Sequence, residues 1–195
     1  MKAMKTVNVR LLLVLVAIGV VGVLCVFLLH RFQVNRNAGS LAKLARLRLE
    51  EGKKDEALTL FARYVNFRPE DDKAYGEFAR LVLDRAESPI ANRGDISRAY
   101  SIVEAAVRKN PEDDELRGRL AAFEMRIGRF VDARQHLQTL RDRLPADAAP
   151  AVKPAGESAP LDRTQIDIML ARAHAGSGNF DEAAAIASEI GRAHV

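Results

Sequence analysis

Hydrophobic and polar positions divide the 195-residue chain into two parts with different patterns. Residues 11–29 read LLLVLVAIGVVGVLCVFLL and carry no charged side chain. A helix of that length rises about 28 Å, close to the ~30 Å hydrocarbon core of a bilayer. The pattern therefore predicts a single transmembrane helix over residues 11–29, preceded by a basic tail at residues 1–10 and followed by a juxtamembrane linker at residues 30–37.

The flanks of this apolar run bear on its processing and its orientation. A cleaved signal peptide is the alternative, but its apolar region is usually about 7–15 residues long and ends at a small-x-small site. This run is longer and no such site follows Leu29, so we expect an uncleaved anchor. Basic residues stand on both sides, and the positive-inside rule gives no clear orientation. A short leading tail usually stays in the cytosol, which favours a single-pass inner-membrane protein whose remaining residues are extracytoplasmic.

From residue 38 onward, apolar residues recur with helical period and three landmarks repeat at fixed offsets. The landmarks are a Gly, an Ala five residues later and a Pro twelve residues after that. Complete copies carry Gly52, Ala57 and Pro69; Gly94, Ala99 and Pro111; and Gly128, Ala133 and Pro145, and a fourth copy begins with Gly178 and Ala183. Each copy also has an upstream Ala after a large apolar residue, at Ala45, Ala79, Ala121 and Ala171.

These residue types predict a helix-turn-helix hairpin in each copy. Gly permits the positive φ that a tight turn can require, and Asp residues near the next helix start favour its N-terminus. Pro ends the second helix because it cannot continue the hydrogen-bond ladder. The Ala residues mark positions at which two helices cross so closely that only a methyl group fits.

The landmark pattern resembles the tetratricopeptide repeat, a 34-residue helical hairpin of α-solenoids. The resemblance implies an all-α fold, an α-solenoid over residues 38–189, with copies at about residues 38–71, 72–113, 114–147 and, incomplete, 164–189. The second copy holds an eight-residue insertion, for which we expect a longer first helix and a loop at Ser88 and Pro89. Residues 146–160 are rich in Pro and Ala and are expected to form a semi-extended linker.

The last six residues, 190–195, break the apolar pattern and match the translation of a sequencing adapter. A solenoid is expected to end in a capping element, and the pattern contains none. We therefore expect a non-native tail on a fragment of a longer protein, with a natural short C-terminus as the alternative.

Charge and side-chain chemistry narrow the function. The formal net charge is +4, but residues 1–29 hold three basic residues and no acid, which leaves 27 Lys and Arg against 26 Asp and Glu in the rest. This balance argues against a nucleic-acid partner, which requires clustered positive charge. The chain has one Cys, four well-separated His residues, no GxSxG motif and no Gly-rich phosphate loop. These features predict no catalytic residues, no cofactor, no metal site and no small-molecule substrate, and hence no enzyme.

What remains is a surface for binding. In tetratricopeptide arrays the first helices line a concave groove, and the residue after the upstream Ala is expected to face it. Those residues are Arg46, Arg80, Ala122 and Arg172. The arginines would favour an acidic peptide, and ordinary solvated arginines on a hydrophilic face are the alternative.

The sequence therefore predicts a membrane-anchored scaffold that binds a protein or peptide partner in a bacterial envelope. Two other interpretations stay open. The chain is the non-catalytic N-terminal part of an enzyme whose catalytic domain is missing, or it is a soluble secreted repeat protein with a cleaved signal peptide.

Overall fold

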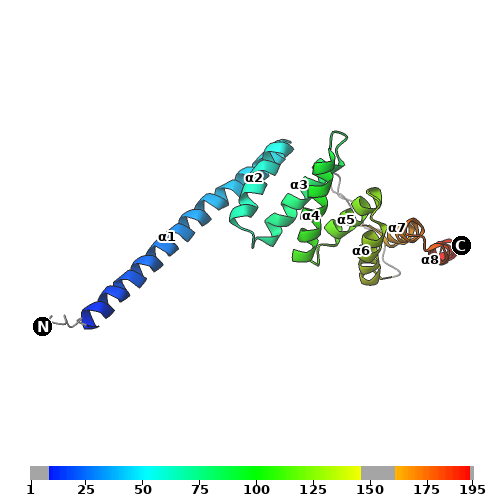
Figure 1. Cartoon of the computed structure of the whole chain (residues 1–195). Helices are drawn as coiled ribbons and strands as arrows, with labels where there is room; N and C mark the ends of the chain where they lie inside the picture. Colours follow the sequence, from blue (N-terminus) through cyan, green and yellow to red (C-terminus); the bar gives the residue numbers. More distant parts are fainter. Residues whose placement is uncertain (1–8, 146–160, 194–195) are drawn as a thin grey trace. The chain divides into compact units, whose positions relative to one another are not determined.

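The computed structural model describes the backbone of residues 9–145 and 161–193, and the side chains of residues 13–28, 39–145 and 161–192. Within these ranges the chain is all-helical, as predicted, and has no strand (Figure 1). The helices are α1 (Val9–Glu50), α2 (Lys54–Phe67), α3 (Asp72–Glu87), α4 (Arg93–Lys109), α5 (Asp114–Arg126), α6 (Phe130–Arg143), α7 (Arg163–Gly176) and α8 (Phe180–Ala193).

Several expected segments lie partly or wholly outside the described residues. These are most of the basic tail at residues 1–10, the whole linker at residues 146–160, and the end of the tail at residues 190–195. The backbone of α1 continues as one helix through residues 30–37, where the sequence pattern led us to expect a linker.

The chain divides into two compact units, Met1–Glu70 and Asp71–Val195. In the first unit α1 packs against α2. In the second unit α3 pairs with α4, α5 with α6 and α7 with α8, and further packing of α4 on α5 and of α6 on α7 joins these hairpins.

The predicted inner-membrane location is wrong. None of the helices, over the part of the chain that the structure describes, is long and apolar enough to cross a bilayer.

Three of the four landmark glycines form the turns between paired helices. Gly52, Gly128 and Gly178 have φ values of 76°, 79° and 85°, a region that side chains with a Cβ rarely adopt. Each follows the first helix of a hairpin, so its positive φ reverses the chain direction within a few residues.

Gly94, the fourth landmark glycine, has a different role because of the insertion. It lies in the first turn of α4, whose N-cap is Asn92. The Asn92 side chain accepts hydrogen bonds from the backbone N–H groups of Gly94 and Asp95, at 2.7 and 3.1 Å, and the Asp95 carboxylate accepts one from the backbone N–H of Asn92. This capping box starts α4 before the expected turn position, so the connection from α3 is the loop at residues 88–92.

Small residues occupy the closest helix crossings. Ala45, Ala57, Ala79, Ala99, Ala121 and Ala133 are fully buried, each at 0% exposure. The corresponding residues of the last hairpin, Ala171 and Ala183, are partly exposed. A core that joins the third and fourth hairpins is formed by Ala121, Leu137, Leu140, Ile166, Leu170, Ala173 and Ile186.

Candidate protein-interaction surface

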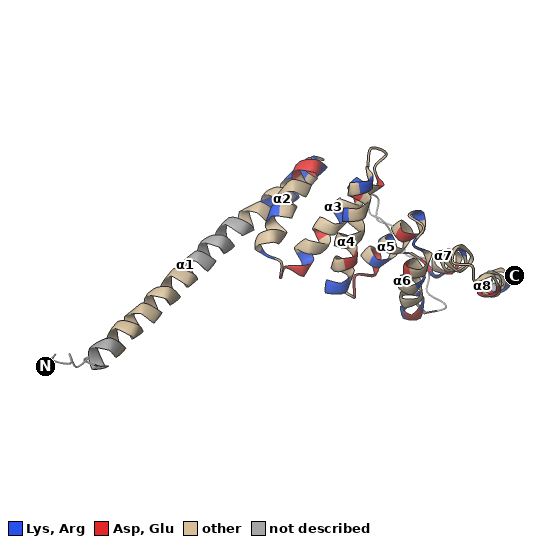
Figure 2. Ribbon diagram, in the orientation of Figure 1, with Lys and Arg blue, Asp and Glu red and all other residues tan. Residues whose placement is uncertain are grey.

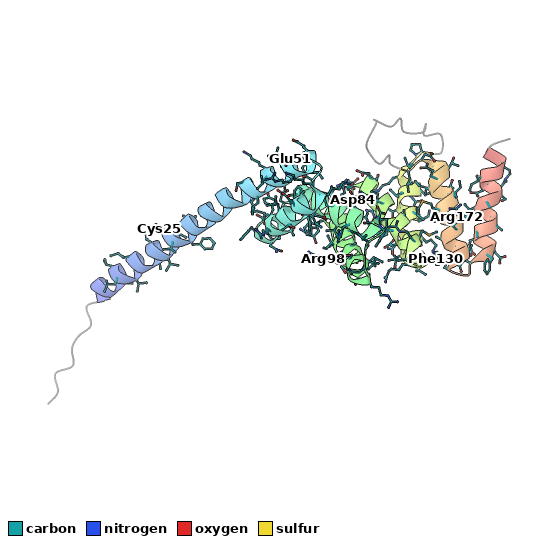
Figure 3. All side chains as sticks on the ribbon, turned by 90° about the horizontal axis from the view of Figure 1, so that it is seen from above. Cys25, Glu51, Asp84, Arg98, Phe130 and Arg172 are labelled. Atoms are coloured by element: carbon teal, nitrogen blue, oxygen red, sulfur yellow. The ribbon has the colours of Figure 1, made fainter. Side chains whose placement is uncertain are left out.

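The first helices of the second unit, α3, α5 and α7, carry the positions predicted to face a partner. Arg80 on α3 is half-buried and Ala122 on α5 is exposed. Arg172 on α7, labelled in Figure 3, is also exposed. Ile168, one turn before Arg172, is 39% exposed. We refer to Arg80, Ala122, Ile168 and Arg172 as the first-helix face. Arg46 is exposed on α1, in the other unit.

The charge of Arg80 is balanced within the chain. Its Nη2 atom donates to both carboxylate oxygens of Asp113 at 2.8 Å and to Oε2 of Glu115 at 3.0 Å. Asp113 also caps α5, since its Oδ1 accepts from the backbone N–H of Leu116 at 3.0 Å. Arg80 therefore joins α3 to the start of α5, and this part of the face does not present an uncompensated positive charge.

Four further charged residues connect the same two first helices. The guanidinium of Arg119 on α5 donates to Asp84 at 2.7 Å and to Glu87 at 3.1 Å, both on α3. Arg126 donates to Glu87 at 3.0 Å. Acidic and basic segments alternate on these helices in Figure 2. We call this set of ion pairs the ion-pair ladder, and its result is a nearly neutral surface between α3 and α5.

The sequence interpretation missed the ion-pair ladder. Its only sequence signal is the spacing, because Asp84 and Glu87 on one helix, and Arg119 and Arg126 on the other, each recur at helical intervals. That spacing shows which residues share a face, but it does not show that the two faces meet.

The joint between the third and fourth hairpins depends on a close contact of another kind. The ring of Phe130, labelled in Figure 3, is at the start of α6 and lies against the backbone of Gly176, at the end of α7. Arg141, near the end of α6, donates to Asp167 of α7 at 2.7 Å and to Glu189 of α8 at 3.0 Å. These contacts fix α7, and with it Ile168 and Arg172, against α6.

A second, polar surface is formed mainly by α6. It is a shallow hollow of about 540 Å³ to which α7 contributes only His174. Its Nδ1 atom is buried and has no hydrogen-bond partner among the described residues. The α6 residues that line the hollow are Val131, Arg134, Gln135, Gln138, Thr139 and Asp142.

Ligands for a metal ion do not gather in the part of the chain that the structure describes. There, no three side chains among His, Cys, Asp and Glu come together in a group suited to hold an ion.

Comparisons with known proteins identify the repeat. Two tetratricopeptide repeat family models match residues 92–153 and 165–189. No curated protein sequence matches the chain.

Solved structures share the fold at low sequence identity. The structure of MamA AMB-1 is 14% identical, with a TM-score of 0.60 over 80% of this chain and 72% of that one. MamA 41-end from Desulfovibrio magneticus RS-1 is 17% identical, with a TM-score of 0.53 over 78% of this chain and 75% of that one. The TPR-like repeats of a Podosopora anserina putative kinesin light chain are 19% identical, with a TM-score of 0.52 over 79% of this chain and 73% of that one. The chain thus contains tetratricopeptide repeats and has an all-helical fold of the TPR solenoid type.

Proposed function

We propose that the chain is a scaffold that binds a protein or peptide partner along the first-helix face of its second unit. The observation that carries the proposal is the exposure of Ala122, Ile168 and Arg172 on helices that belong to tetratricopeptide repeats. Stacked hairpins hold such positions at regular intervals, and an elongated ligand can contact several of them at once.

The chemistry of the face suggests the kind of partner. Ala122 and Ile168 offer small and apolar contacts, whereas Arg172 offers a positive charge. Arg80 is already paired with Asp113 and Glu115, so an acidic ligand would have to displace those carboxylates to reach it. We therefore expect a partner segment with an apolar anchor beside α5 and α7 and an acidic residue near Arg172.

Site-specific photo-crosslinking tests this proposal. A photoreactive amino acid is introduced at Ala122 or Arg172, and in matched controls at Gln135 or Gln138, in the hollow on α6. All four positions are on helix surfaces, so the variants are expected to fold. We expect discrete crosslinked species from the first two positions only. Crosslinks from the α6 positions alone, or equally from both faces, would overturn the assignment of the binding face.

A further inference from the structure

Glu124, on α5, is a buried carboxyl group without a hydrogen bond among the described residues. The residue is 0% exposed, and neither carboxylate oxygen has a hydrogen-bond partner within the described residues. An ionised carboxylate in such surroundings has lost its hydration without gaining donors in exchange, which is strongly unfavourable.

The groups around Glu124 come from α4, α5 and α6, since α5 packs against both of the other helices. His136 on α6 is the nearest titratable side chain, with its Nε2 atom 3.7 Å from Oε1 of Glu124. Its other ring nitrogen, Nδ1, lies 3.4 Å from the guanidinium of Arg117 on α5. We call these buried groups and their charged neighbours the Glu124 seam; its members are Tyr100, Glu104, Arg117, Glu124, Arg129, Asp132 and His136.

The positive charge of Arg129, which acts on Glu124, is engaged elsewhere. The guanidinium of Arg129 lies 4.2 Å from the centroid of the Tyr100 ring and donates to Asp132 at 2.7 Å. Glu104 on α4 pairs with Arg108, one helical turn further along. The remaining charges that act on Glu124 include two carboxylates, Glu104 and Asp132, and like charges oppose its ionisation.

These surroundings shift both members of the Glu124–His136 pair toward their neutral forms. Burial raises the pKa of Glu124 to about 8; Asp132 and Glu104 add to this shift and Arg129 opposes it. Burial, and then the positive charge of Arg117, lowers the pKa of His136. The separation of 3.7 Å would permit an ion pair if both groups were charged. We favour the neutral pair because the carboxylate has no donor and the imidazole faces a guanidinium.

We propose that the Glu124 seam is a proton-dependent joint between the second and third hairpins, closed when the Glu124 carboxyl is protonated and loosened when it ionises. The ion-pair ladder joins the same hairpins through α3 and α5. The loosening is therefore expected on the side of α4 and α6, so that the joint opens as a hinge.

The direction of the pH effect follows from linkage. Glu124 binds its proton more tightly in the closed seam than in an opened or unfolded chain, where its pKa is near the ordinary 4.5. Its contribution to stability is complete below that value and is lost as the pH rises through about 8. Between these limits each pH unit is expected to raise the opening constant of the seam by about tenfold.

Two measurements on the full chain test the proposal. The first is the titration of the Glu124 side-chain carboxyl by carbon-13 NMR in the wild-type protein. The second is amide hydrogen exchange in α4, α5 and α6 between pH 6 and pH 8, corrected for the intrinsic pH dependence and compared with α2 of the other unit. We expect Glu124 to titrate near pH 8 and protection in the three helices to fall by about tenfold or more.

Variants separate the seam from general effects of pH. Glu124→Gln keeps the shape of the side chain but cannot titrate. In this variant, the hydrogen-exchange protection of α4, α5 and α6 is expected to be independent of pH over this range. The matched control is Glu182→Gln, an exposed glutamate on α8, which is expected to behave like the wild-type protein. Titration of Glu124 below about pH 6, or the same loss of protection in Glu124→Gln, would overturn the proposal. The wild-type titration decides the question even if Glu124→Gln does not fold.

Discussion

Phe130 and Gly176 are in such close contact that a Cβ atom on Gly176 would lie 2.7 Å from two carbons of the Phe130 ring. The nearest atoms belong to the base of the ring rather than to a flexible tip, so the helices themselves would have to move. We expect Gly176→Ala to lower the free energy of unfolding by about 1–3 kcal/mol, measured by urea denaturation. The matched control is Gly191→Ala on α8, where a Cβ atom would meet nothing within 4 Å. That variant is expected to be neutral or slightly stabilising, and equal destabilisation by the two variants would contradict the role of the contact.

The turn between α5 and α6 depends on Gly128 for a different reason. Space is available there, but the φ value of 79° is unfavourable for residues with a Cβ. We expect Gly128→Ala to destabilise the second unit by about 1 kcal/mol. Gly128→Asn is expected to be milder, because Asn tolerates the left-handed region better than Ala does. Thermal unfolding followed by circular dichroism measures both, and a larger loss for Asn than for Ala would argue against backbone strain as the cause.

Asp113 makes two interactions, of which Glu115 makes only one. Both pair with Arg80, but Asp113 also caps α5 through the backbone N–H of Leu116. We expect Asp113→Ala to reduce the free energy of unfolding by about 1–3 kcal/mol, and Glu115→Ala by less than about 1 kcal/mol. Urea unfolding in low and high salt separates the contribution of the ion pair from that of the helix cap, because salt weakens the ion pair and leaves most of the cap. Equal losses in the two variants would show that the cap contributes little.

His136 is expected to make the stability of the folded protein depend on pH below the ordinary pKa of an imidazole. Burial and Arg117 lower its pKa, so the folded protein favours the neutral imidazole. Its contribution to stability is present above the ordinary value of 6.5 and is lost as the pH falls through the lowered value. Glu124 gains stability over the same range, so the effect of His136 appears as a difference between two proteins. As the pH falls below 6.5, we expect the midpoint of urea unfolding of the wild-type protein to decrease relative to that of His136→Gln. A constant difference between the two midpoints over this range would contradict the role of His136.

The hairpins could be predicted from the sequence because their determinants are local. Gly128 and Gly178 form turns, Pro111 and Pro145 follow the ends of α4 and α6, and the landmark alanines of the first three hairpins are buried. Gly94 departed from this pattern because Asn92, inside the insertion, provides an alternative helix start. Here a local capping signal overrode the repeat.

The charged contacts could not be predicted, because they depend on how helices from different hairpins meet. The sequence shows that Arg80 can face a groove, but its pairing with Asp113 requires the start of α5 to lie beside α3. Likewise, Glu124 occurs in a sequence of charged and apolar residues that is compatible with an exposed position. Only the packing of α5 between α4 and α6 shows that this carboxyl group is buried.

The dissociation constant of a partner captured through Ala122 or Arg172 is the most direct test of partner binding by the first-helix face. It is measured by isothermal titration calorimetry for the wild-type protein, for the double variant Ala122→Glu and Arg172→Glu, and for Gln138→Glu in the hollow on α6. We predict at least about tenfold weaker binding by the double variant and an almost unchanged constant for Gln138→Glu. Unchanged binding by the double variant, together with weakened binding by Gln138→Glu, would contradict the proposed face and place the partner on α6.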